Sequence, residues 1–304
     1  MTAPHVPNEP ATPTREGGLV RLRLDVSYDG TDFSGWARQP GRRTVQGVLE
    51  DALAKQPPGA SVPRSVVVAG RTDAGVHASG QVVHVDVEPM SGEPSSRRLT
   101  VDDRGIPDLE RMRHRWNRIL PADVRVLGAR IAPEGFDARF SATRRHYRYQ
   151  VSDAPWGVDP LRRHDTLAWG RPLSVEAMND ASQVLLGLHD FAAYCKQREG
   201  ATTIRELQRL RWRRVAEHEV HVEVSADAFC HSMVRSLVGA LLLVGDGRRT
   251  VGWPGDVLDS QVRESSVAPA HGLTLVRIDY PPDAELAARA EQTRNVRTAL
   301  PGTE

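Results

Sequence analysis

The 304-residue sequence predicts an α+β fold with two halves, each having the element order of a ferredoxin-like or RNA-recognition-type unit. Three observations support this prediction. Several short segments alternate apolar and polar residues with the period of two that half-buried strands show. Longer segments between them repeat apolar residues at helical spacing. In each half these segments follow in the order strand–helix–strand–strand–helix–strand, although the sequence has no evident internal repeat.

The composition is that of an ordinary globular protein with one large or two smaller domains, since 39% of the residues are hydrophobic and 26% are charged. No apolar run is long enough to span a membrane, and residues 1–18 lack the apolar core of a signal peptide. The two cysteines, Cys195 and Cys230, are too few for a disulfide framework or a cysteine-rich zinc site. We therefore expect a cytoplasmic protein.

The first half is expected to cover residues 19–137, after a disordered tail at 1–18. Leu22, Leu24 and Val26 alternate with polar residues and predict a strand that ends at a turn after Tyr28. Thr44 is a suitable N-cap for a helix over 45–56. The expected elements that follow are strands at 66–69 and 82–87, a mobile insertion at 88–108, a helix at 109–120 and a strand at 123–132.

The second half is expected to cover 138–283, followed by a polar, partly helical tail at 284–304. Its strands are predicted within 136–151, as a hairpin at 204–215 and 218–226, and within 268–281. One helix is expected over 174–186, and a largely buried helix within 227–249. His189 and Asp190 are placed on a helix with a structural role, because neighbouring helical residues point in different directions.

The loop between the strands at 66–69 and 82–87 carries a single carboxylate, Asp73, with Arg71 two residues before it. Gly70 and Gly75 on either side allow the backbone to turn tightly. Catalytic groups are often placed on loops that rigid elements support, although an Asx-turn would equally explain an aspartate here. Arg235 is the one charge inside the buried helix, so it requires an anionic partner.

The basic residues are almost all arginines, since only Lys55 and Lys196 are lysines. The net charge of +1 does not itself indicate a nucleic-acid-binding protein, and codon usage accounts for the overall excess. Local clusters are more informative, because arginines interleaved with Tyr147 and Tyr149 suit looped or single-stranded RNA. The candidate phosphate contacts are Arg38, Arg42, Arg43, Arg139, Arg144, Arg145 and Arg148.

Five blocks between residues 20 and 282 resemble, in order, the motifs of the TruA family of tRNA pseudouridine synthases. They include YDGTDFSGWARQPGRRTVQGVLEDAL, GRTDAGVHASGQVVHVD, FDARFSATRRHYRYQV, DAFCHSMVR and APAHGLTL. The sequence departs from the family pattern at Ala37, Trp116, Cys230 and Ser232. The resemblance implies that the two halves join into one largely antiparallel sheet with a basic cleft between them, and that the protein is a homodimer.

The resemblance also implies the reaction, in which a uridine at positions 38 to 40 of the tRNA anticodon stem-loop becomes pseudouridine. No metal or nucleotide cofactor is expected. By the same resemblance, Asp73 is the essential residue, Arg235 pairs with it, Tyr147 stacks on the target uracil and Leu273 lines the uracil pocket. We expect Asp73 to act as nucleophile or base, held ionised by Arg235 together with Arg71. Tyr147 is also a candidate for removing the C5 proton.

Two alternatives remain open at this stage. One is an RNA-binding protein of the same fold that lacks catalysis. The other is a hydrolase with two carboxyl groups, Asp73 and Asp86, since glycosidases place two carboxyl groups across a sugar. The sequence decides neither the form of the Asp73 chemistry nor the choice of tRNAs, and it leaves open the effect of Cys230 and Ser232.

Overall fold

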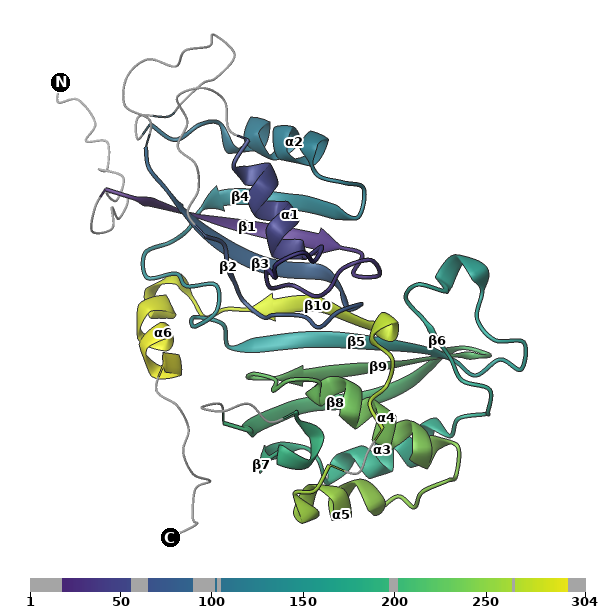
Figure 1. Ribbon diagram of the computed structural model, residues 1–304. Coiled ribbons are helices and arrows are strands. Elements are labelled where there is room, and N and C mark those ends of the chain that lie inside the picture. The colour runs from purple at the N-terminus through teal and green to yellow at the C-terminus, as the bar shows by residue number, and fades with distance from the viewer. Residues whose placement is uncertain are drawn as a thin grey trace, which may run out of the picture.

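The computed structural model describes residues 18–55, 65–89, 102, 105–196, 202–263 and 266–294. In these residues the chain forms a mixed α+β fold around a single ten-stranded sheet (Figure 1). The predicted α+β class with a mostly antiparallel sheet is confirmed. None of the helices in these ranges has the length and apolar character needed to cross a membrane.

The first half contains the predicted order of elements. They are β1 (Val20–Tyr28), α1 (Val45–Leu53), β2 (Val67–Val68), β3 (His77–Val87), α2 (Leu109–Ile119) and β4 (Val124–Ile131). Alternate residues of β1 are buried, as the two-residue pattern predicts. The Thr44 side chain accepts a hydrogen bond from Gly47 N and so caps α1, while Asp108 caps α2 in the same way through two backbone amides.

The second half has the same core order with three additional short elements. It comprises β5 (Arg144–Ser152), β6 (Leu167–Ala168), α3 (Val175–Gln183), β7 (Gly187–Asp190), β8 (Ile204–Ala216), β9 (Glu219–Ala226), α4 (Met233–Gly245), α5 (Trp253–Ser260) and β10 (Leu273–Asp279), followed by α6 (Leu286–Arg294). Nearly every residue of α4 is buried, which explains why its sequence is apolar around most of its circumference.

The sheet order is β4–β1–β3–β10–β5–β9–β8–β7, with β2 beside β3 and β6 beside β5. β10 therefore joins the halves, because it lies antiparallel to β5 and parallel to β3 (Figure 1). Gly80 of β3 is needed at this junction, since a Cβ there would lie 2.2 Å from the carbonyl oxygen of Val276. A larger residue at position 80 would push the two strands apart.

Several local expectations differ from the structure. His189 and Asp190 lie on strand β7 and not on a helix, and Asp190 caps the following turn by accepting from Ala192 N. The buried helix begins at Met233, so Phe229 precedes it, and α5 was not predicted. Cys195 and Cys230 are joined in a single disulfide, with Cα atoms 5.7 Å apart. Residues 1–17 of the expected tail at 1–18, and most of the 88–108 insertion, lie outside the described residues.

Four of the five tyrosines are buried and Tyr280 is partly buried, and desolvation raises the pKa of each above its ordinary value, to about 12 for Tyr28. The phenols therefore stay neutral in the fold at a pH where the unfolded chain ionises. Below pH 10 the tyrosines are neutral in both states, and their contribution to the free energy of unfolding is complete. Above pH 10 the unfolded chain loses phenolic protons that the fold retains, so the free energy of unfolding falls by up to about 1.4 kcal/mol per tyrosine for each pH unit.

In an alkaline titration we consequently expect tyrosinate absorbance to rise in one cooperative step, together with the loss of far-ultraviolet circular dichroism. In guanidinium the same absorbance should titrate near pH 10. Tyrosinate that forms near pH 10 while the circular dichroism is unchanged would contradict the prediction.

Candidate active site

Hydrogen bonds from buried side chains fix the loop between β2 and β3. The Thr72 hydroxyl lies 2.7 Å from the Tyr28 hydroxyl, and the Gln81 amide donates to both Tyr28 Oη and the Gly70 carbonyl. Gly75 has a φ of +78°, in the left-handed region that favours glycine. The loop therefore has a fixed backbone, and the Asp73 side chain projects from it with about a quarter of its surface exposed.

Asp73 meets residues of the second half through both of its carboxylate oxygens. The Ser232 hydroxyl donates to Oδ2 at 3.2 Å, and Nη1 of Arg235 donates to the same oxygen at 3.5 Å. Nε2 of His231 lies 3.2 Å from Oδ1. Arg235 is thus paired with Asp73, as predicted. The Asp73 carboxylate faces α4 and does not form an Asx-turn.

Arg235 is positioned by two bonds that connect α4 to the loop before β10. Its Nε donates to the Ala268 carbonyl at 2.7 Å, and the Ala268 amide donates to the Arg235 carbonyl at 3.0 Å. The same loop continues into Leu273 at the start of β10. A shift of α4 would therefore move Arg235 and Leu273 together.

Asp73 lines a cavity of about 780 Å³ to which both halves contribute. Of its described lining residues, only Asp73 carries a carboxyl group, whereas six carry a basic side chain. These are Arg71, Arg139, Arg145, Lys196, Arg205 and Arg235. Such a lining attracts phosphates and leaves one acidic group to perform chemistry.

Tyr147 and Leu273, to which the family resemblance assigns contacts with the base, also line the cavity. The Tyr147 ring packs edge-on against Phe229, with ring centroids 5.1 Å apart. Burial raises the pKa of Tyr147, so its hydroxyl is neutral at physiological pH. The ring is therefore suited to stacking, and a phenolate form of Tyr147 is disfavoured.

The predicted phosphate contacts divide into two groups. Arg139 and Arg145 line the cavity together with Arg71, which is exposed there and makes no ion pair with Asp73 in the described part of the chain. The others lie outside the lining. Arg38 pairs with Glu50 and Asp51, and Arg43 pairs with Asp123 while its guanidinium covers the Phe33 ring.

Arg144 and Arg148 are exposed on β5, whereas Arg145, Tyr147 and Tyr149 are buried. Successive residues of a strand point to opposite faces of the sheet, so Arg144 and Arg148 face away from Tyr147. The sequence pattern of arginines and tyrosines therefore reflects two separate surfaces and not one binding strip. Arg42 is exposed in the loop before α1.

Arg145 has a structural environment that the sequence does not indicate. Only 7% of its surface is exposed, and its guanidinium donates to four backbone carbonyls. These belong to Ala69 at 3.1 Å, Arg139 at 2.7 Å, Ala142 at 3.4 Å and Asp227 at 2.6 Å. Because both terminal nitrogens of its guanidinium already donate to carbonyls, we assign Arg145 to supporting the cavity and not to contacting phosphate.

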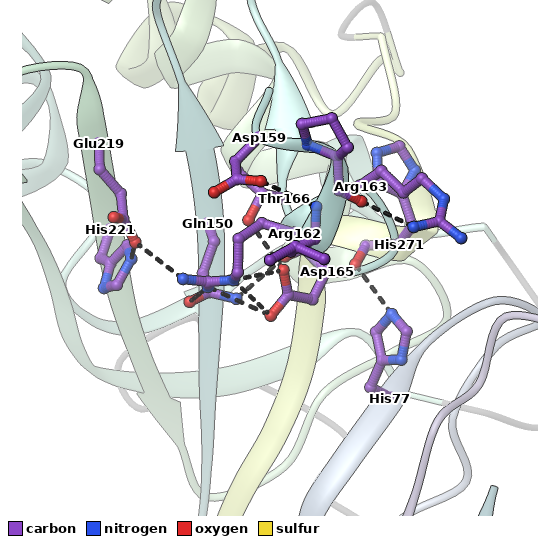
Figure 2. Close-up of polar contacts among 12 residues, drawn as sticks. His77, Gln150, Asp159, Arg162, Arg163, Asp165, Thr166, Glu219, His221 and His271 are labelled. Atoms are coloured by element: carbon purple, nitrogen blue, oxygen red, sulfur yellow. Dashed lines mark hydrogen bonds and ion pairs between the residues drawn. The ribbon is translucent and has the colours of Figure 1, made fainter. Parts of the chain in front are cut away.

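Polar contacts surround the start of β3 and the end of β5 (Figure 2). His77 accepts from Gly30 N through Nδ1, and its Nε2 faces the His271 carbonyl at 3.0 Å. Arg162 contacts both Asp165 and Gln150. His77 thereby links the loop after β1, the exit of the Asp73 loop and the segment before Leu273.

Asp86, the second carboxylate of the hydrolase alternative, is placed away from the cavity lining. Arg21 donates to both of its oxygens at 2.6 Å, and Arg21 also donates to the Phe136 carbonyl. A carboxylate engaged by an arginine outside the cavity does not form a pair with Asp73 across a sugar. The geometry therefore argues against that alternative.

Several polar residues that line the cavity were not predicted as site residues, among them Lys196, Arg205, His231 and Ser232. Lys196 and Arg205 lie in segments with no motif that marks a site. His231 and Ser232 come directly before a buried helix that contains a charge, and this position was the available signal. A residue at the start of such a helix lies close to whatever partner that charge requires.

Comparison with protein families matches residues 26–140 and 181–281 to the model described as tRNA pseudouridine synthase. The tRNA pseudouridine synthase A of Frankia casuarinae is 58% identical over 283 residues, which cover 92% of this chain and 96% of that protein. Proteins with the same name from Streptomyces griseus and Mycobacterium leprae are 55% and 53% identical, and cover 94% and 92% of this chain and 97% and 96% of their own lengths. Likeness to a solved dye-decolorizing protein from V. cholerae, with a TM-score of 0.19, is too low to be informative.

Proposed function

The chain belongs to the tRNA pseudouridine synthase family, and we propose that it isomerises uridines at positions 38 to 40 of the tRNA anticodon stem-loop, with Asp73 as the catalytic carboxylate. The family makes the protein an isomerase that acts on uridine in tRNA. The choice of the anticodon stem-loop rests on the motif resemblance described above. The role of Asp73 rests on its place in the cavity.

The reaction breaks the bond between N1 of uracil and C1′ of the ribose, and forms a new bond from C5 to C1′. C5 loses its proton and N1 gains one, so no electrons are exchanged with a cofactor. Asp73 acts on the ribose–uracil unit as nucleophile or base. Arg235 pairs with its carboxylate, and Tyr147 and Leu273 contact the base.

The observation that carries this proposal is the single carboxylate among the described residues of the cavity lining, which Ser232 and Arg235 contact at the junction of the two halves. A uridine reaches such a group only after it leaves its stack, which costs a few kcal/mol. The basic lining supplies part of this energy through phosphate contacts. Arg71, Arg139 and Lys196 are the candidates, because Arg145 and Arg205 donate to backbone carbonyls.

The proposal includes a homodimer in the cytoplasm, where tRNA is available. Sedimentation equilibrium of the full chain tests the first point, and a mass of twice 33.5 kDa is the expected result. A monomer at all concentrations would contradict it without affecting the catalytic proposal.

The activity is tested by incubating the protein with an unmodified tRNA transcript that carries uridines at positions 38 to 40 and elsewhere. Pseudouridines are mapped by carbodiimide adducts and primer extension. We expect stops at positions 38 to 40 only, and none in a matched transcript with cytidines there. Stops at other uridines would overturn the positional assignment. Absence of pseudouridine at any uridine, with a known synthase active in parallel, would favour the RNA-binding alternative.

A further inference from the structure

We propose that Ser232 and His231 are positioning residues that fix the orientation of the Asp73 carboxylate. Ser232 bonds one carboxylate oxygen, and His231 lies beside the other. The proposal rests on the proposed function, because it concerns how Asp73 is held for the same reaction. It extends that function to two residues of the turn before α4 to which no role was assigned from the sequence.

Ser232 has an unusual conformation for the first residue of a helix. It is the N-cap of α4, and its carbonyl accepts the helical bond from Ser236 N. An N-cap serine normally uses its hydroxyl to accept from an amide of the first turn, but here no such bond is made and the hydroxyl donates to Asp73. The helix therefore forgoes a stabilising cap in order to bind the carboxylate.

The backbone conformation of Ser232 is also unfavourable. Its φ is +64°, and within the described residues only Gln261 is another non-glycine residue with a positive φ. A side chain in the left-handed region is disfavoured, and such strain is characteristic of functional sites. Glycine would relieve the strain, so the presence of a serine with its hydroxyl on Asp73 indicates that the hydroxyl is needed.

His231 approaches the other oxygen from the same turn. Its Nε2 lies 3.2 Å from Asp73 Oδ1, and a proton on Nε2 is required, because two lone pairs at this distance would repel. The His231 carbonyl accepts from Lys196 N at 3.0 Å, and the disulfide joins the residues just before these two. The turn is thus anchored to the segment after β7 and presents a fixed donor.

Together with Arg235, the two residues leave the carboxylate little freedom to rotate. Ser232 and Arg235 occupy Oδ2, and His231 occupies Oδ1. Positioned reacting groups react faster because the orientation is fixed before the reaction begins. Loss of Ser232 or His231 should therefore reduce kcat, while the affinity for tRNA, which depends on the basic lining, should change little.

The test compares Ser232→Gly with Ser232→Asn. Glycine suits the positive φ but removes the hydroxyl, so we expect kcat to fall about 10- to 100-fold with KM for tRNA unchanged and with Tm within about 3 °C of the wild type. Asparagine tolerates the left-handed region and restores a donor, so Ser232→Asn should recover most of kcat. In parallel, His231→Leu should lower kcat to a similar degree and His231→Gln should restore it.

Wild type is assayed alongside, and a wild type that forms no pseudouridine would overturn the proposed function itself. With an active wild type, an unchanged kcat in both Ser232→Gly and His231→Leu would overturn the positioning proposal. A joint fall of kcat and Tm in Ser232→Gly, without recovery in Ser232→Asn, would equally overturn it, because the role of the turn would then be structural.

Discussion

Replacing Asp73 with asparagine is expected to reduce pseudouridine formation by at least about 10³-fold. Asparagine has the same shape and keeps an oxygen that accepts from Ser232 and Arg235, so the loop should remain in place. It lacks the negative charge and the basicity that either form of the chemistry requires. Tritium release from tRNA labelled at C5 of uridine measures the rate, because the reaction removes that proton.

Measuring the affinity of Asp73→Asn for tRNA distinguishes a loss of catalysis from a loss of tRNA recognition. Asp73 is the one acidic group among the described residues of the cavity lining, so its neutralisation should leave the affinity for tRNA equal or slightly higher. Asp86→Asn is the matched control, since Asp86 pairs with Arg21 outside the lining, and it should keep its activity at temperatures where it is folded. Substantial activity in Asp73→Asn would remove Asp73 from the mechanism.

Replacing Arg145 with methionine is expected to have the largest effect on stability. The substitution leaves four carbonyls without their charged donor inside the fold, which costs on the order of 3–5 kcal/mol. For a chain of this length the corresponding fall in Tm is roughly 10 °C. Differential scanning calorimetry or thermal circular dichroism measures the change.

Arg148→Met is the control for this substitution, because Arg148 lies on the same strand and is exposed on the opposite face. Its Tm should differ little from that of the wild type. If Arg145 were a phosphate contact, Arg145→Met would instead keep its Tm, weaken tRNA binding and reduce the slope of log affinity against log salt by about one. That result would reverse the structural assignment of Arg145.

The fold was largely predictable because its strands and helices carry clear periodicity. β1 alternates buried and partly buried residues along its whole length, and α1 and α2 begin at recognisable capping residues. The strand at His189 and Asp190 was missed because β7 is short and its residues have no alternating burial. Helix α5 begins with glycine, tryptophan and proline, which do not form an apolar stripe that indicates a helix.

The centre of the candidate site was also predictable, and its surroundings were not. A charge inside an apolar helix requires an opposite charge, so the sequence indicated an anionic partner for Arg235, and the family resemblance identified Asp73 as that partner. The arginines were harder to assign, since local sequence does not tell whether a guanidinium reaches a cavity, a carboxylate or backbone carbonyls. The distinction between Arg145 and Arg148 depends on which face of the sheet is covered, and Arg145 is covered by segments distant in the sequence, at Ala69 and Asp227.

The place of β10 between β3 and β5 also affects how the protein is made. About 200 residues separate the Asp73 loop from β10, so a ribosome that adds roughly 5–20 residues per second needs tens of seconds between them. During this interval the edge of β3 that later pairs with β10 has no final partner, and an open strand edge is prone to aggregation. Translation therefore completes the pocket only with the last strand, and a chain released before β10 would carry Asp73 without Leu273.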